Sequence, residues 1–95
     1  MKRPCVYLLA SGRNGTLYVG VTSGLTKRLS LHREDVIGGF TQKYGVHRLV
    51  WFEEFEDMPT AITREKQIKK WNRAWKLRLI ELHNSQWRDL WEEIV

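Results

Sequence analysis

A chain of 95 residues can bury one modest hydrophobic core, so residues 1–95 are expected to form a single domain. The 16 Lys and Arg residues outnumber the 11 Asp and Glu residues, and the net charge of +5 favours a polyanionic partner. A single cysteine excludes an intramolecular disulfide and a multi-cysteine zinc site, and no apolar run is long enough to span a membrane. These features predict a soluble protein of the reducing cytoplasm, with no membrane partner.

The first predicted element is a β-hairpin. Residues 4–10 form a short apolar run, "SGRNG" places Gly and Asn where a turn needs them, and "TLYVGVT" at 16–22 is a second β-rich run. Tyr7 and Tyr18 stand on these two neighbouring strands. Either the two phenols serve a common site, or they pack within the sheet, where tyrosine is frequent.

A helix, a loop and a third strand are predicted next. Leu25 and Leu29 at helical spacing indicate a helix from about Leu25 to Asp35, and the triplets "GGF" and "KYG" mark the loop that follows. The run "VHRLVWFEEF" at 46–55 is rich in β-branched and aromatic residues, which is typical of a strand.

Three further helices complete the chain. Asp57 is the expected cap of a helix that has Pro59 in its first turn and runs to about Asn72, and "AWKLRLIELH" forms another helix after a bend. Ser85 is the expected N-cap of the last helix. One face of that helix is expected to carry Trp87, Leu90, Trp91 and Ile94. The element order ββαβααα predicts an α+β fold.

The positive charge is concentrated in one segment. Residues 60–79 carry seven basic side chains and one acid, Glu65, so this segment has a net charge of +6 and the rest of the chain sums to −1. Such local charge is expected of a surface that faces phosphates, and a solvated helix face is the alternative. Packing is the preferred interpretation of Trp71 and Trp75, which lie beside these charges.

The lone acid of this segment is its most informative residue. In a straight helix the positions three, four or seven residues from Glu65 are Ala61, Ile62, Ile68 and Asn72. The carboxylate therefore falls on a face that is buried or lines a cleft, where it needs a cationic partner. Either it forms a buried ion pair with an arginine of the first helix, or it ligates a hard metal ion that faces a phosphate.

The first predicted helix carries a second polar pair. Arg28 and His32 are four residues apart, so they share one stripe beside the apolar stripe of that helix. An arginine offers a permanent charge and a fork that matches phosphate oxygens, and a histidine adds a proton donor or acceptor near neutral pH. Solvation at the surface is the alternative for each residue.

These residues resemble, in their order and spacing, the motifs of the GIY-YIG nuclease superfamily. The triplets "CVY" at 5–7 and "YVG" at 18–20 are similar to its two signature tripeptides. The segment "LTKRLSLH" supplies the arginine and the histidine, and "AITREKQIKKWNRAWK" looks like the glutamate-bearing helix of the small stand-alone bacterial members, which resemble the N-terminal domain of an excision-repair nuclease. The similarity runs from about Pro4 to the C-terminus and implies a three-stranded antiparallel sheet flanked by helices.

The resemblance also implies an activity and roles for the motif residues. The family cleaves phosphodiester bonds in DNA with one divalent metal ion, Mg²⁺ or Mn²⁺, and Glu65 matches the metal ligand. Tyr7 and Tyr18 would face the scissile phosphate, one assisting deprotonation of the attacking water and the other orienting water or phosphate. Arg28 would stabilise charge on the phosphate, and His32 would assist it or share the role of base. Because tyrosine has an ordinary pKa of about 10, a nearby cation must favour the phenolate.

The chain departs from the family pattern at two places. Cys5 stands where the first tripeptide of the family begins with glycine. The asparagine that relatives carry after the glutamate has Asn72 and Asn84 as its candidates. The basic residues expected to contact DNA are Lys27, Lys66, Lys69, Lys70 and Arg73.

A small domain has little area for reading a long DNA sequence, so the shape of the DNA or a partner protein would have to supply selectivity. The sequence therefore predicts a metal-dependent endonuclease acting on branched, flapped or damaged DNA. One alternative is a catalytically silent nucleic-acid-binding module with the same fold. Another is a protein-interaction domain that uses the aromatic and acidic C-terminal helix.

Overall fold

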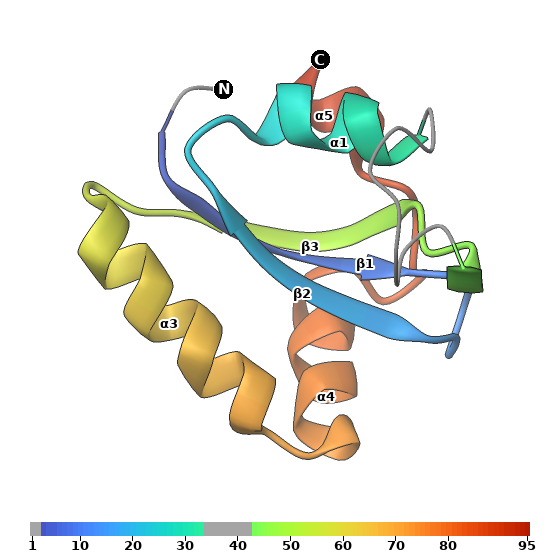
Figure 1. Cartoon of the computed structure of the whole chain (residues 1–95). Helices are drawn as coiled ribbons and strands as arrows, with labels where there is room; N and C mark the ends of the chain where they lie inside the picture. The colour runs from blue at the N-terminus through green and yellow to red at the C-terminus, as the bar shows by residue number, and fades with distance from the viewer. Residues whose placement is uncertain (1–2, 34–42) are drawn as a thin grey trace.

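The computed structural model describes residues 3–33 and 43–95. Along the chain its elements are β1 (Cys5–Ala10), β2 (Leu17–Thr22), α1 (Leu25–Arg33), β3 (Arg48–Glu54), α3 (Met58–Lys70), α4 (Arg73–His83) and α5 (Trp91–Ile94). This order confirms the predicted succession ββαβααα and the α+β class (Figure 1). The expected end of the first helix at Asp35 and the "GGF" triplet lie outside the described residues. Within those residues, no helix has the length and apolar character that crossing a membrane requires.

The three strands form one antiparallel sheet in the order β2-β1-β3. In the central strand, Tyr7 lies opposite Gly20 of β2 on one side and Phe52 of β3 on the other. The pairing of β1 with β3 shifts between Leu8 and Leu9, which marks a β-bulge. All six side chains of β1 are buried, because other elements cover both faces of the sheet.

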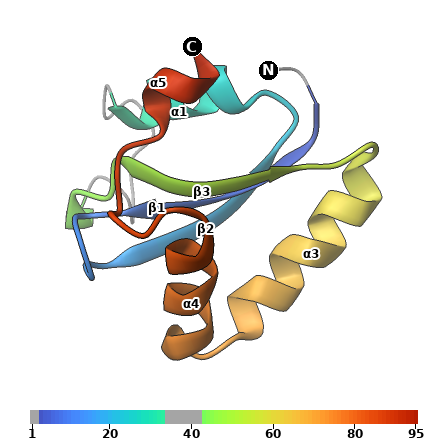
Figure 2. The same ribbon diagram turned by 180° about the vertical axis from the view of Figure 1, so that it is seen from behind.

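Alternate side chains of β1 belong to opposite layers of the molecule. Tyr7 and Leu9 pack in a cluster with residues of α1 and of the C-terminal segment. Val6 and Leu8 pack in a second cluster with residues of α3 and α4. Figures 1 and 2 show α1 and α5 on one face of the sheet and α3 and α4 on the other. The phenol of Tyr7 therefore lies on the α1 face.

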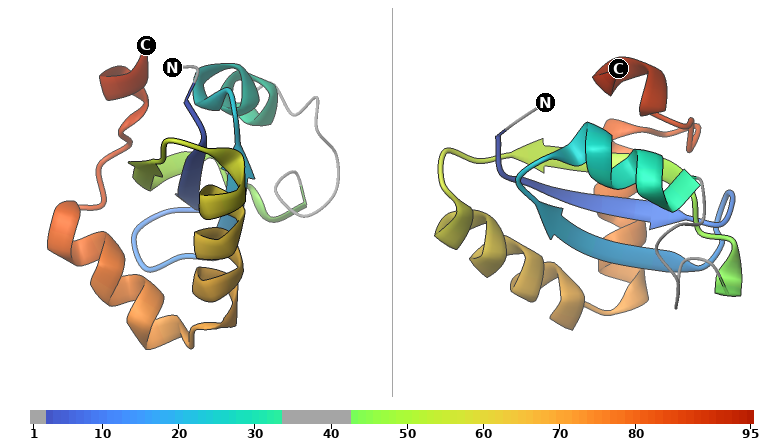
Figure 3. Two further views of the ribbon diagram at one scale, coloured as in Figure 1. Left: turned by 90° about the vertical axis from the view of Figure 1, so that its left-hand side faces the viewer. Right: turned by 45° about the horizontal axis from the view of Figure 1, so that its top comes forward.

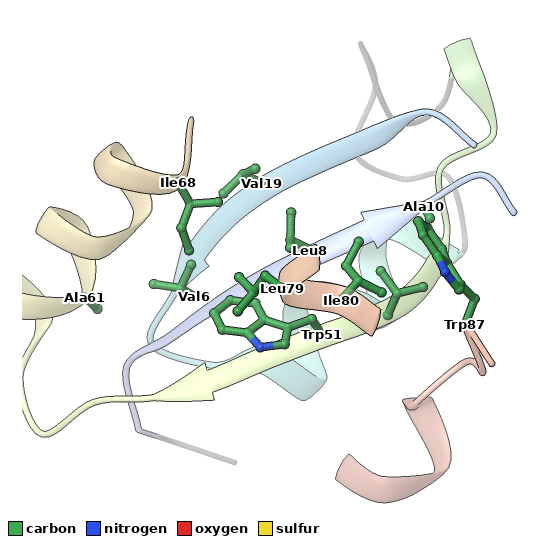
Figure 4. Close-up of a cluster of buried hydrophobic side chains, with 11 residues drawn as sticks. Val6, Leu8, Ala10, Val19, Trp51, Ala61, Ile68, Leu79, Ile80 and Trp87 are labelled. Carbon is green, nitrogen blue, oxygen red and sulfur yellow. The ribbon is translucent and has the colours of Figure 1, made fainter. Parts of the chain in front are cut away.

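The second cluster shows how the two long helices share their face of the sheet (Figure 4). Ile68 of α3 lies beside Val6 of β1 and Val19 of β2, whereas Leu79 of α4 lies beside Trp51 of β3. Helix α3 thus covers the β2 side and α4 the β3 side. This arrangement holds α3 close to the strands that carry the two tyrosines.

Side-chain caps set where α3 begins and where α4 begins. Oδ1 of Asp57 accepts a hydrogen bond from the amide of Thr60 at 2.8 Å, which caps α3 as predicted and lowers the pKa of Asp57. Helix α3 ends at Lys70, before the expected end at Asn72, because Trp71 adopts extended backbone angles. Asn72 instead caps α4.

The prediction of one C-terminal helix after Ser85 is wrong in its first half. Only Trp91–Ile94 is helical, and Trp87 has a φ of 56°, in the left-handed region that a regular helix excludes. The segment between α4 and α5 passes the β3 edge of the sheet, where the amide of Leu90 donates to the carbonyl of Leu49 (Figure 3). Trp87 is therefore buried in the α3 and α4 layer and Leu90 in the α1 layer, so the expected common face does not form.

Candidate active site

Three aromatic rings meet on the α1 face of the sheet. Tyr7 and Tyr18 come from neighbouring strands, and His32 comes from the last turn of α1. The ring centroids lie 6.3 Å apart for the two tyrosines, 6.2 Å for Tyr7 and His32, and 5.7 Å for Tyr18 and His32. A long hydrogen bond of 3.4 Å joins the Tyr7 hydroxyl and Nε2 of His32. The structure thus brings together three of the residues expected at the site.

Gly20 makes room for the Tyr7 ring. A Cβ atom at this position would lie 2.9 Å from Cε1 of Tyr7 and still closer to its Cζ and hydroxyl oxygen. Gly20 was not among the expected site residues, although a single glycine inside a β-rich run indicates a close approach of other atoms to the backbone. Gly20, the last residue of the second tripeptide, therefore has to be glycine because the ring of Tyr7, from the first tripeptide, lies against it.

Arg28 lies on the exposed side of α1, beside an open hollow of about 410 Å³. The hollow is lined by Thr22, Ser23, Gly24, Lys27, Arg28 and Leu31. The charge of Arg28 also affects two of the aromatic residues. It lowers the pKa of Tyr7, which burial raises. It lowers the pKa of His32, which burial lowers as well. Two cationic side chains in its wall make the hollow suitable for an anionic group.

Glu65 lies on the buried face of α3, as its spacing predicted. The residue is 8% exposed, and its Oε2 pairs with Nζ of Lys69 at 2.7 Å. Of the two alternatives for this carboxylate, the structure shows an ion pair, but its partner is a lysine one turn further along the same helix and not an arginine of the first helix. The negative charge of Glu65 also reaches Tyr7, whose pKa it raises in addition to the larger effect of burial.

Burial dominates the ionisation of the Tyr7 hydroxyl. Tyr7 is 1% exposed, and its desolvation raises its pKa well above the usual value for tyrosine. Tyr18 and Glu65 raise this pKa further, and Arg28 opposes them. The expectation that a cation favours the phenolate is therefore not met by Arg28 alone, and Tyr7 is a neutral phenol at neutral pH.

Burial also favours the neutral form of His32. Burial lowers its pKa, and the charges of Arg28 and His47 lower it further. A neutral imidazole can accept a hydrogen bond at one ring nitrogen. Nε2 of His32 can thus accept a hydrogen bond from the Tyr7 hydroxyl when the ring carries its proton on Nδ1.

The side chains expected to contact DNA are all exposed, namely Lys27, Lys66, Lys69, Lys70 and Arg73. Lys27 lines the hollow beside α1, and the other four belong to α3 and α4. Besides the Lys69 ion pair, Nη2 of Arg73 donates to the carbonyls of Asn14 and Gly15 in the hairpin turn, at 2.8 and 2.7 Å. The basic residues therefore form two groups, in opposite layers of the molecule.

Both candidate asparagines have structural roles. Oδ1 of Asn72 accepts a hydrogen bond from the amide of Trp75 at 2.9 Å and so caps α4. Asn84 is buried at the end of α4, where its Nδ2 donates to the carbonyls of Val50 and Arg88 at 3.1 and 2.8 Å. The side-chain amides of both asparagines thus form hydrogen bonds with backbone groups of neighbouring segments.

A three-stranded antiparallel sheet, two facing tyrosines on its hairpin and a buried glutamate on an adjacent helix define a GIY-YIG type of domain. In agreement, residues 3–78 match the family described as the GIY-YIG catalytic domain. The chain belongs to this family, whose superfamily consists of nucleases, and the resemblance drawn from the motifs is confirmed.

Similar proteins include small relatives of nearly the same length. The chain is 40% identical over 75 residues to the UPF0213 protein CPE1444 of Clostridium perfringens, covering 79% of this chain and 80% of that one. It is 37% identical over 82 residues to a UPF0213 protein of Syntrophus aciditrophicus, covering 85% and 93%. Its fold is similar to the solution NMR structure of the UPF0213 protein BH0048 from Bacillus halodurans, with a TM-score of 0.58, 25% identity and 92% of each chain covered. The names of these relatives state no activity.

Proposed function

We propose that this protein is a divalent-metal-dependent endonuclease that hydrolyses phosphodiester bonds in DNA. The strongest support is the surroundings of the Tyr7 hydroxyl. Nε2 of His32 lies within hydrogen-bond reach of it, the Tyr18 ring is adjacent, and the charges of Arg28 and Glu65 both act on it. These five residues occupy motif positions of a nuclease superfamily, and they stand on strands and helices, which hold a catalytic geometry better than loops do.

In the proposed reaction, a water molecule attacks the phosphorus of the scissile phosphate. The water passes a proton to the Tyr7 oxygen as the Tyr7 hydroxyl passes its own proton to Nε2 of neutral His32. A free Tyr7 phenolate, which burial disfavours, is then never required. The new oxygen–phosphorus bond forms while the bond to the leaving sugar oxygen breaks, and that oxygen takes a proton from solvent. Arg28 balances charge on the phosphate oxygens, and Tyr18 orients the water or the phosphate.

Glu65 is the proposed ligand of one divalent ion, Mg²⁺ or Mn²⁺. Magnesium is commonly held by one or two carboxylates together with water and substrate phosphates, so a single carboxylate of this kind suits it. In residues 3–33 and 43–95, no three His, Cys, Asp or Glu side chains are grouped to hold a metal ion on their own. When bound, the ion supplies Lewis-acid stabilisation of the phosphate. Lys69 neutralises the carboxylate until then and has to release it.

The proposed substrate is branched, flapped or damaged DNA. The hollow beside α1 has two cationic side chains in its wall and is lined by six residues, so it can hold a phosphate group but offers little surface for reading a long sequence. DNA shape or a partner protein then supplies the selectivity, and the exposed lysines and arginines contact the phosphate backbone. We place this activity in a single domain spanning residues 1–95 and in the cytoplasm, the reducing compartment that the lone cysteine favours.

A catalytically silent nucleic-acid-binding module is the second candidate. The ion pair between Glu65 and Lys69 favours it, because a neutralised carboxylate needs no metal ion. The third possibility, a partner-binding C-terminal helix, has less support, because two of its aromatic side chains make contacts within the molecule. Trp87 is buried, and the guanidinium of Arg33 covers the ring of Trp91 at 4.6 Å.

The Glu65→Gln variant tests the enzymatic proposal. This change removes the anionic ligand and keeps the shape of the side chain, so metal-dependent cleavage should disappear while DNA affinity and fold are preserved. Wild type and variant are incubated with linear, flapped and four-way-branched DNA in the presence of Mg²⁺, Mn²⁺ or a chelator. Glu56→Gln, a change of the same charge at an exposed position outside the site, is the matched control and should cleave as wild type does.

The outcomes separate the two candidates. Cleavage by wild type and the control, but not by Glu65→Gln, supports the endonuclease and its metal ligand. Cleavage that survives in Glu65→Gln shows that the metal ligand is wrong. Equal DNA binding by all three proteins without any cleavage favours the silent module.

A further inference from the structure

An apolar groove lies at the corner between α3 and α4, outside the proposed active site. It encloses about 220 Å³ and is lined by Trp71, Trp75, Arg78, Leu79 and Leu82. Trp75 is 53% exposed and Leu82 is 74% exposed. The described part of the chain has four exposed large hydrophobic side chains, 48–74% exposed, and two of them line this groove. Trp75 is therefore not part of the hydrophobic core, although its ring packs against that of Trp71, and its exposed face leaves an apolar surface that a ligand could contact.

The two indoles give the groove a shape that suits one flat ring. Their planes are nearly perpendicular, at 78°, with centroids 5.9 Å apart. The guanidinium of Arg64 already covers the Trp71 ring at 5.1 Å. A planar group stacked on Trp75 would meet Trp71 at a right angle. The volume is below the roughly 300–1,000 Å³ of pockets for drug-sized ligands, so a single ring system fits it best.

The groove also lies in the most basic part of the chain. Residues 66–78 contain six lysines and arginines and no acid. Of these, Arg78 belongs to the wall of the groove, whereas Arg73 and Lys76 line a separate hollow beside the hairpin. One acid, Glu81, lies near the groove, in an adjoining hollow that Arg78 and Leu82 also line. An occupant that complements these features is planar and apolar where it enters the groove and strongly anionic around it. A nucleobase on its phosphate backbone has this combination. An acidic peptide would match the charge but would gain less from two flat aromatic walls.

We infer that the groove binds an unpaired nucleobase stacked on Trp75 while the surrounding cations contact the phosphates of the same strand. This inference rests on the proposed function and specifies its substrate class, which is DNA with a bulged or single-stranded nucleotide. Bases of an intact duplex stack on one another and cannot enter the groove. The groove therefore distinguishes unpaired from paired DNA without reading its sequence.

Binding measured in the presence of a chelator tests this inference apart from cleavage. Fluorescence anisotropy compares a short duplex with the same duplex carrying a one-nucleotide bulge and with its single strand. Wild type should prefer the two DNAs with unpaired bases. Trp75→Ala should lower their affinity by about 5- to 150-fold and leave duplex affinity nearly unchanged, because one stacked base is lost. Trp75→Phe, which keeps an aromatic face, should retain most of the preference.

Two controls make the result specific. Val95→Ala changes a side chain that is 69% exposed but lies outside the groove, so it should not alter any affinity. Lys70→Ala removes a phosphate contact and should weaken binding to all three DNAs by a similar factor. Thermal unfolding of each variant shows whether the fold is kept, and the Phe variant provides a second reading if Trp75→Ala unfolds.

The opposing results are distinct. An unchanged preference for unpaired DNA in Trp75→Ala overturns the inference, and so does an equal loss for duplex and bulged DNA. If Trp75→Ala changes only self-association or the binding of an acidic peptide, the groove is a protein-binding surface and the inference is likewise overturned. If wild type binds no DNA at low salt, the proposed function fails as well. If wild type cleaves DNA while Trp75→Ala keeps the preference, only the inference fails.

Discussion

Replacing Gly20 by alanine tests whether the Tyr7 ring lies where the proposed reaction needs it. The new Cβ would lie 2.9 Å from Cε1 of Tyr7 and closer still to the atoms at the hydroxyl end, whereas ordinary contact begins at 3.4 Å. Since Tyr7 is 1% exposed, its ring has no free space to enter and the surrounding residues must move with it. Overpacking of this kind costs about 1–3 kcal/mol of unfolding free energy.

Thermal unfolding and cleavage assays read out the two consequences of this change. In a domain of this size, 1 kcal/mol lowers the melting temperature by roughly 4–8 °C, so Gly20→Ala should melt about 4–24 °C below wild type. Cleavage should also fall at temperatures where the variant is folded, because the Tyr7 hydroxyl is displaced from His32. Gly12→Ala is the matched control, since a Cβ there meets no atom within 4 Å.

A Gly20→Ala protein as stable and as active as wild type would refute this reasoning, because it would show that the Tyr7 ring does not lie over Gly20. A variant that is destabilised but cleaves at the wild-type rate while folded would refute only the proposed role of the Tyr7 hydroxyl in the reaction. In that case the position of the Tyr7 hydroxyl would matter for packing and not for the reaction.

Two further predictions concern the C-terminal segment and the histidine. Asp89 accepts a hydrogen bond from the amide of Leu49 at 3.3 Å and pairs with Arg33, so Asp89→Ala should lower the free energy of unfolding by about 1–3 kcal/mol. Asp89→Asn keeps an acceptor and should lose less; equal losses in denaturant titrations would contradict this explanation. Burial, and then the charge of Arg28, lowers the pKa of His32 from its ordinary value of 6.5, so the unfolded chain binds this proton more readily than the folded protein. The free energy of unfolding should therefore fall as the pH drops below 6.5, and an NMR titration of His32 with a midpoint above 6.5 would show the opposite linkage.

Much of the fold could be predicted because its signals are local. Asp57 and Pro59 mark the start of α3 through a side-chain cap and a fixed backbone angle, and both act within one turn of the chain. The apolar run of β1 and the turn residues after it define the hairpin in the same way. The buried position of Glu65 followed from helical spacing alone, which α3 preserves.

The C-terminal residues show where local signals fail. Trp87 and Trp91 are spaced as on one face of a helix, yet they lie in different layers of the molecule. The spacing of apolar residues indicates which side chains are buried, but not against which element each of them packs. It cannot distinguish a helix that packs one face from an irregular segment that passes a sheet edge and packs on both sides.

The order of the amino acids was sufficient for the succession of elements and the class of fold, because these depend on neighbours within a few positions, and for the family, because its motifs keep their order and spacing along the chain. Only the folded structure shows that Lys69 is the partner of Glu65, that burial raises the pKa of Tyr7 beside His32, and that Gly20 has to be small. It also shows that Trp75 is exposed, where packing had been expected. These properties depend on distances and desolvation between residues far apart in the chain, and such quantities exist only after the sheet and its two helical layers have come together.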